Sequence, residues 1–399
     1  MSARVVKLTG LKYRDTYFDT LWVILDQHSS PPILPLMYTT QLSRFGVVYD
    51  AKELSVETAR KRIKSLEPRE VSDSTIRAYV YCLAKFFTYL EHCKETHQTP
   101  GMHASSSCSE KFVNHYLNHV LAQNLNSSLS LNTHRSALMS YFTWLAFMEI
   151  RPSLNLRIYR KTRQAMAEKS IKQNYIQYVS KFWRFALLNA CETLAEKLMM
   201  RMGYEVGLRT SELRGLRVSG KNNLNKLFTR LSDRDCDHIN CFRYWLEGRY
   251  TKGSKSRWVY FDRNLLIDMK RYFDTERQWL IDETGRDDNS FFLRTDQRFK
   301  GTAIGEEQAS RVFRKRAEQA GLNPELSFHD LRHTFATELF QAEIEGSEGR
   351  ETRSESAALI AVSQRLGHKI GKDGNAPPVT TRYIRMRLQM MELEEVTNE

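Results

Sequence analysis

The chain has 399 residues, of which 41% are hydrophobic and 27% charged, a balance typical of a soluble globular protein with two or three domains. No window of about 20 uncharged apolar residues occurs, which excludes a membrane span. The N-terminal stretch "MSARVVKLTGLKYRD" has no apolar signal core, which favours an intracellular protein. Lys and Arg number 60 against 47 Asp and Glu, a net charge of +13 that favours a polyanionic partner such as nucleic acid. A merely basic protein is the alternative.

Six cysteines are scattered along the chain, and reduced thiols are the default for an intracellular protein of this size. The stretch "HCKETHQTPGMHASSSC" gathers two cysteines and three histidines, but its spacing fits no standard zinc module. The segment "CDHINC" is a weaker candidate still. We therefore expect no metal and no cofactor.

Helical patterns dominate the first third of the chain. The stretch "SDSTIRAYVYCLAKFFTYLEHC" opens with N-cap residues and continues with apolar residues at helical spacing, namely Ile76, Val80, Leu83, Phe87 and Leu90. A second helix is predicted over 109–123, and a third in "LNTHRSALMSYFTWLAFMEI", with Leu138, Phe142, Leu145 and Met148 facing inward. These patterns predict an N-terminal extension over 1–25 and a compact helical domain over 26–150, with a loop at Ser127–Ser130.

Residues 151–172, "RPSLNLRIYRKTRQAMAEKSIK", contain seven Lys and Arg and one Glu, and Pro152 favours a break near their start. One interpretation is a solvated basic linker between two domains. The other is a linker that also follows DNA phosphates. In the second case the candidate DNA-binding residues are Arg157, Arg160, Lys161 and Arg163.

A second domain is predicted over 173–399. At least two helices come first, and then two strand-like runs, "CFRYWLEGRY" and "SRWVYFD", flank the turn sequence "TKGSK" as in a hairpin. Helices are expected again at 262–281 and 306–320, in "SFHDLRHTFAT", at 354–366 and from about 380. The predicted fold class is mainly α with a small antiparallel β-sheet in this second domain.

Two candidate site residues lie in the first half of this domain. Arg209, in "YEVGLRTSELRGL", is expected at a helix N-terminus, where backbone N–H groups favour an anion, and Glu212 could hold its guanidinium. Lys252 lies at the tip of the predicted hairpin. Alone, each is explained as well or better by an ordinary structural role, a capped helix for Arg209 and a solubilising turn for Lys252.

The other candidates lie further along. On a helix, His329 shares a face with both Arg332 and His333, and His333 is expected to be structural. His368 lies in "QRLGHK". Tyr383, in "VTTRYIRM", is the single tyrosine after Tyr272, although a buried or interfacial tyrosine is common.

The motifs "GLRTSEL", "TKGSK", "HDLRHTFAT", "LGHK" and "TTRY", in this order, resemble the tyrosine recombinase (phage integrase) family. The resemblance implies a two-domain DNA clamp, with a helical SAM-like core-binding domain and a tyrosine recombinase catalytic domain over 173–399. It implies a site-specific recombinase of a mobile element, bacterial or phage-encoded and cytoplasmic. Its partners would be a double-stranded DNA recombination site, further copies of the chain in a tetramer, and accessory proteins.

The resemblance also implies a role for each residue. Tyr383 would be the nucleophile that forms a 3′-phosphotyrosyl intermediate, and Arg209 and Arg332 would bind the phosphate oxygens through their planar guanidinium groups. His329 would assist proton transfer and His368 would hydrogen-bond to the phosphate, while Lys252 would protonate the leaving 5′-oxygen. Glu212 and His333 would support them. Neither metal nor ATP would be required.

Two segments depart from the family pattern. "KIGKDGNAPPVTTR", between His368 and Tyr383, is longer than usual, and "QAEIEGSEGRETRSESA" lengthens the part before "LGH" as an expected surface insertion. They leave open whether Tyr383 docks in its own active site or in a neighbour's. The alternatives are a type IB-like topoisomerase or telomere resolvase, and a non-catalytic DNA-binding factor. A metal-dependent transposase is disfavoured because no spaced carboxylate triad is evident.

Overall fold

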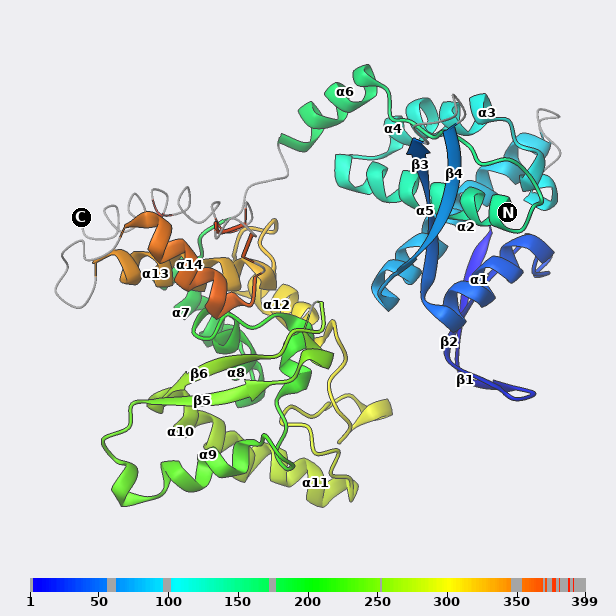
Figure 1. The fold of residues 1–399 in the computed structure, drawn as a ribbon. Helices are drawn as coiled ribbons and strands as arrows, with labels where there is room; N and C mark the ends of the chain where they lie inside the picture. Colours follow the sequence, from blue (N-terminus) through cyan, green and yellow to red (C-terminus); the bar gives the residue numbers. More distant parts are fainter. Residues whose placement is uncertain are drawn as a thin grey trace. The chain divides into compact units, whose positions relative to one another are not determined.

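The computed structural model describes residues 3–55, 62–95, 102–171, 177–251, 253–345 and 354–368, together with single positions and short stretches up to residue 390. The chain divides into two compact units, Met1–Tyr175 and Ile176–Glu399 (Figure 1). Within the described residues, no helix has the length and apolar character needed to cross a membrane.

The first unit is built around two long helices, α2 (Asp73–Glu95) and α5 (Ser128–Phe147). The predicted inward face of α2 is confirmed, because the five apolar residues expected on it, from Ile76 to Leu90, are all at most 4% exposed. In α5, Leu138, Phe142 and Leu145 are buried, but Met148 is 38% exposed because the helix ends just before it. The shorter helices of this unit are α1 (Ile33–Phe45), α3 (Glu110–His115), α4 (Ala122–Asn124) and α6 (Arg160–Ile171). A 3₁₀ turn at Met102–Ser107 precedes α3, and a π turn at Tyr116–Leu121 joins α3 to α4.

Two antiparallel hairpins in this unit were not predicted from the sequence. Strands β1 (Arg4–Tyr13) and β2 (Thr16–Leu25) form the first, and β3 (Val47–Ser55) and β4 (Arg62–Glu70) form the second (Figure 1). Trp22 and Ile24 of β2 belong to the core that surrounds α2 and α5. The predicted N-terminal extension over 1–25 is therefore a hairpin that contributes to the core of this unit.

Residues 151–159 form a segment of the first unit without regular secondary structure. Leu154 and Leu156 are buried, and the Asn118 side chain both donates to the Arg157 carbonyl (2.8 Å) and accepts from the Tyr159 backbone N–H (2.7 Å). Helix α6 begins at the next residue, Arg160. The predicted basic linker thus begins with an irregular segment anchored in the first unit and continues as a helix.

The second unit is mainly helical around one small antiparallel sheet, which confirms the predicted fold class. Strands β5 (Cys241–Leu246) and β6 (Arg257–Asp262) form the sheet within the two predicted runs, although β5 ends at Leu246 and a 3₁₀ helix covers the predicted strand end at Gly248–Tyr250. Its helices are α7 (Lys181–Ala190), α8 (Leu194–Tyr204), α9 (Leu224–Leu231), α10 (Arg263–Tyr272), α11 (Gln278–Thr284), α12 (Gln308–Gln319), α13 (Phe328–Glu345) and α14 (Glu355–Leu366). A π turn at Phe273–Arg277 joins α10 to α11, and short 3₁₀ helices cover Thr210–Gly215, Arg234–Cys236, Gly248–Tyr250 and Gln297–Phe299.

Helix α13 contacts both α8 and α14. Gly203 of α8 permits a close approach, because a Cβ at this residue would lie 2.9 Å from the Leu331 Cβ. The end of α14 meets β6 at Gly367, where a Cβ would lie 2.9 Å from the Arg257 Cδ. These contacts gather three distant parts of the sequence: the end of α8, strand β6, and the pair of helices α13 and α14. The segment 346–353 of the expected surface insertion lies outside the described residues.

Candidate active site

Arg209 lies at the start of the 3₁₀ helix Thr210–Gly215, just after the end of α8. Its backbone N–H donates to Glu212 Oε2 (2.8 Å), and its Nη1 donates to Glu212 Oε1 (2.7 Å). Glu212 therefore both caps the helix and holds the Arg209 guanidinium, as its position three residues after Arg209 permits. The Arg209 side chain keeps 21% of its surface exposed, so it remains accessible to an anion from solvent.

Glu212 itself is fully buried and is held by Arg257 at the start of β6. Arg257 donates from Nη1 to Oε1 (2.6 Å) and from Nη2 to Oε2 (2.8 Å) of this carboxylate. Burial alone would raise the pKa of Glu212, but hydrogen bonds from Arg257 and the charges of Arg332, Arg257 and Arg209 lower it to about 2. The carboxylate is therefore ionised at neutral pH.

Arg332 lies on α13 and is the most deeply buried arginine of the cluster, with 1% of its surface exposed. Its Nη1 donates to the Gly207 carbonyl and, at 3.4 Å, to Glu212 Oε2, while its Nη2 donates to the Leu366 carbonyl (2.7 Å). Arg332 thereby ties the end of α8 to the end of α14. Gly207 has φ +72°, and a Cβ there would lie 2.4 Å from a ring carbon of Phe335, so glycine is required at this approach.

His329 and His333 lie one turn apart near the start of α13, with ring centroids 4.4 Å apart. His329 is exposed, whereas His333 is buried, 7% exposed, which agrees with its expected structural position. The start of the helix is capped by Asp330, whose Oδ2 accepts from both the backbone N–H and the hydroxyl of Ser327 (2.8 Å each). The capped first turn fixes the position from which His329 projects.

His368 follows the C-terminal glycine of α14, and its backbone N–H donates to the Ser363 carbonyl (2.8 Å). Burial lowers the pKa of His368, and the charges of Arg332, Arg209, Arg257 and His329 lower it further, to about 4. The imidazole is therefore neutral at physiological pH. Its Nδ1 lies 3.0 Å from the hydroxyl oxygen of Thr380.

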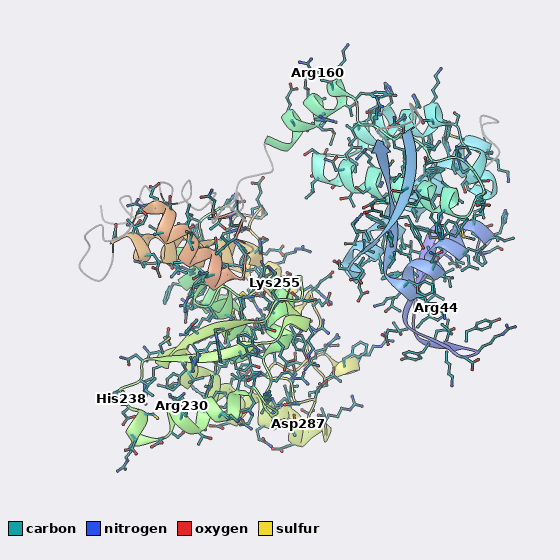
Figure 2. The ribbon with its side chains drawn as sticks, viewed as in Figure 1. Arg44, Arg160, Arg230, His238, Lys255 and Asp287 are labelled. Atoms are coloured by element: carbon teal, nitrogen blue, oxygen red, sulfur yellow. The ribbon has the colours of Figure 1, made fainter. Side chains whose placement is uncertain are left out.

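Two predicted site residues, Lys252 and Tyr383, lie outside the described residues. Lys255, in the same hairpin loop as Lys252, is described, and its side chain is exposed (Figure 2). Of the predicted residues that the structure describes, Arg209, Glu212, His329, Arg332 and His368 meet in one place.

Arg257 belongs to the same cluster and was missed from the sequence. The strand pattern did contain a signal, since Arg257, Val259 and Phe261 alternate along β6 and all three are buried. An arginine on the inward face of a strand requires a buried anionic partner, which here is Glu212. Three guanidinium groups thus surround one carboxylate, and the cluster keeps a net positive charge suited to an anion such as a phosphodiester.

The predicted DNA-binding residues lie in the first unit. Arg157 is exposed, and its Nε donates to Asn155 Oδ1 (3.1 Å). Arg160, Lys161 and Arg163 are exposed on α6, from which Arg160 extends in Figure 2. In the part of the chain that the structure describes, no disulfide joins any of the six cysteines, and no group of three His, Cys, Asp or Glu residues is arranged to hold a metal ion.

Comparison with known proteins agrees with the resemblance that the motifs indicated. The model of the phage integrase family matches residues 184–348, and the model of the phage integrase N-terminal SAM-like domain matches residues 63–148. Tyrosine recombinase XerA of Pyrococcus horikoshii is 24% identical over 83% of this chain and 92% of its own. Tyrosine recombinase XerD of Oceanobacillus iheyensis is 23% identical over 81% of this chain and 92% of its own.

Among solved structures, the XerH site-specific recombinase in a post-cleavage complex with its palindromic difH substrate has a TM-score of 0.51 and 18% identity. The match covers 81% of this chain and 80% of the XerH chain, and it shows a shared fold. The two family models cover well over half of the chain and include both of its units. The chain therefore belongs to the phage integrase family and is a tyrosine site-specific recombinase.

Proposed function

We propose that this recombinase cuts and rejoins double-stranded DNA at a specific site, with the Tyr383 hydroxyl as nucleophile. The observation that carries the proposal is that Arg209, Arg257 and Arg332 surround a single carboxylate and that the charges of these arginines act on His368. A phosphodiester is already anionic and gathers more charge in its transition state, so a preorganised cationic site lowers the barrier.

In the proposed reaction, the Tyr383 oxygen bonds to phosphorus as the bond to the 5′-oxygen breaks. The phenolic proton passes to His329, and the leaving 5′-oxygen takes a proton from Lys252. Arg209 contacts a phosphate oxygen directly, because it is the more exposed of the two predicted arginines. Arg332 is buried and contributes through its positive charge. The phosphotyrosyl bond conserves the energy of the phosphodiester, so another 5′-hydroxyl can reseal the strand without ATP.

Chain length supports Tyr383 as the nucleophile. Thr380, three residues before Tyr383, is hydrogen-bonded to His368. Three residues of chain span at most roughly 10–11 Å, a length that allows a tyrosine to reach the arginine cluster.

The proposal extends to the partners. Exposed basic residues on α6 would follow DNA phosphates, and a DNA-bound relative such as the XerH complex supports duplex DNA as the substrate. Exchange of strands between two duplexes, each cut on both strands, requires four tyrosines and therefore a tetramer. We assign the protein to the integration or excision of a mobile element, with accessory proteins that bias the direction.

Trapping of covalent DNA adducts tests this function and identifies the target sequence in the same experiment. The protein is incubated in EDTA with fragmented DNA from its source, adducts are recovered under denaturing conditions, and the attached fragments are sequenced. We expect adducts at one sequence, attached through a 3′-phosphate. Adducts spread over unrelated sequences would instead indicate a topoisomerase-like activity.

Two variants give the controls for this experiment. Tyr383→Phe removes the proposed nucleophile and should yield no adduct while DNA binding persists. Arg209→Ala should bind DNA but lose roughly 10²–10³-fold in cleavage rate, the cost of one preorganised donor. Adducts that persist in Tyr383→Phe would show that another residue is the nucleophile.

A further inference from the structure

Two buried hydroxyl groups form a series of hydrogen bonds that ends at the His368 ring. Ser363 of α14 donates from its Oγ to Thr380 Oγ1 (3.2 Å), and Thr380 Oγ1 lies 3.0 Å from His368 Nδ1. Ser363 and Thr380 are both 0% exposed, so bulk water does not compete for these bonds.

The order of donors along this series favours one position for the proton of the His368 ring. A hydroxyl has one proton to donate and two lone pairs to accept. Because Thr380 Oγ1 accepts from Ser363, its own proton is available for His368 Nδ1. When Thr380 donates this proton to Nδ1, the proton of the neutral ring resides on Nε2.

We propose that Thr380 is a positioning residue, whose hydroxyl holds neutral His368 as the Nε2–H tautomer so that the histidine donates a hydrogen bond to the phosphate. The inference rests on the proposed function and on the hydrogen bond from His368 to the phosphate that the family resemblance implies. It adds a residue that acts through His368 and determines whether the histidine can serve as a donor.

The tautomer matters because His368 is neutral near pH 7. Its burial and the neighbouring charges of Arg332, Arg209, Arg257 and His329 lower its pKa to about 4, so it carries one ring proton rather than two. With the proton on Nδ1, the other nitrogen would present a lone pair to an anionic oxygen and repel it. With the proton on Nε2, the same nitrogen stabilises the anion.

The same hydroxyl also belongs to the segment that leads to Tyr383. The Thr380 backbone N–H donates to the Pro377 carbonyl (2.8 Å). The residue that contacts His368 thus lies three positions before the proposed nucleophile in the sequence.

Nitrogen NMR of the full-length protein, labelled with ¹⁵N in its histidine rings and free of DNA, tests the tautomer without any need for activity. The His368 signals are assigned by their absence in His368→Gln. We expect the Nε2–H tautomer in the native protein and in Thr380→Ser, and loss of this preference in Thr380→Val. Thr39→Val, which removes a buried threonine hydroxyl in the first unit, should leave the His368 signals unchanged.

An Nδ1–H tautomer in the native protein, or an unchanged tautomer in Thr380→Val, would overturn the inference. The second measurement is the cleavage rate on the trapped target site. Thr380→Val should slow cleavage by at least about tenfold, up to the roughly 10²–10³-fold loss of a whole donor, and Thr380→Ser should restore it. A changed tautomer with an unchanged cleavage rate would also overturn the positioning role. Absence of cleavage in the native protein would instead reject the proposed function, while the tautomer result would stand.

Discussion

Glu212 and Arg257 are joined by two parallel hydrogen bonds, of 2.6 and 2.8 Å, across 45 residues of sequence. The pair links the 3₁₀ helix that presents Arg209 to the strand that follows the hairpin loop. Glu212 also contacts Arg209 and Arg332, so one carboxylate sets the spacing of three guanidinium groups. The buried glutamate thus organises a site whose proposed ligand is itself an anion.

Arg257→Ala should destabilise the catalytic unit strongly. It leaves Glu212 buried without its two-bond partner, and breaking a buried pair in this way typically costs about 3–5 kcal/mol. Urea unfolding followed by tryptophan fluorescence measures the effect. The control is Arg294→Ala, because Arg294 forms a two-bond pair with Asp296 (2.6 and 2.9 Å) that is partly exposed, and this change should cost less than about 1 kcal/mol. Equal losses of unfolding free energy in the two variants would show that the buried Glu212–Arg257 pair is no more important for stability than a partly exposed pair.

The stability of this unit should fall in acid because of Glu212. Its pKa is about 2 in the folded protein, below the ordinary value of 4.5. A lowered carboxylate pKa contributes stability that is present above the unfolded pKa and is lost as pH falls towards the folded pKa, so the loss should occur between about pH 4.5 and 2 and amount to roughly 3 kcal/mol. The measurement is the difference in unfolding free energy between the native protein and Glu212→Gln. That difference should shrink steadily over this range, and a constant difference would show that the carboxylate charge is unimportant.

The sequence predicted the local features of the fold well, because they depend on neighbouring residues. The apolar spacing from Ile76 to Leu90 and the turn between β5 and β6 were both sufficient. The first hairpin was missed because both faces of β2 are covered, so that Leu21, Trp22, Val23 and Ile24 are buried in succession without polar alternation. Trp22, for example, is buried in the core around α2.

In the site, residues that belong to short motifs could be predicted from the sequence, whereas the long-range contacts between them could not. Arg209, Arg332 and His368 could be nominated from short motifs, and the structure brings them together. The burial of Arg257 depends on Glu212, 45 residues away in sequence, and the contact of His368 depends on Thr380, 12 residues away. Such contacts depend on tertiary packing, which no local pattern encodes.

Gly367→Ala should disturb the site through Arg257. Gly367 has φ +69°, and an added Cβ would lie 2.9 Å from the Arg257 Cδ, so Arg257 must move away from Glu212. Gly285→Ala is a matched control, since Gly285 also ends a helix with φ +64° and an added Cβ would meet no described atom within 4 Å. Both variants incur the backbone cost of about 1–2 kcal/mol, but only Gly367→Ala should also slow DNA cleavage. Equal cleavage rates in the two variants would show that the Gly367 contact does not support the site.

Charge removal on α6 should reduce the salt dependence of DNA binding. Arg160, Lys161 and Arg163 are exposed, while Met166 of the same helix is buried, so their replacement by Gln should leave the packing of the helix intact. Each phosphate contact contributes about 0.9 to the slope of log K against log salt concentration. The triple variant should therefore have a slope shallower by up to about 2.7, measured by fluorescence anisotropy with a labelled duplex. Arg230→Gln removes one exposed charge from α9 of the other unit and serves as the control, with a slope close to that of the native protein. A triple variant whose slope equals the native value would show that α6 does not lie on DNA.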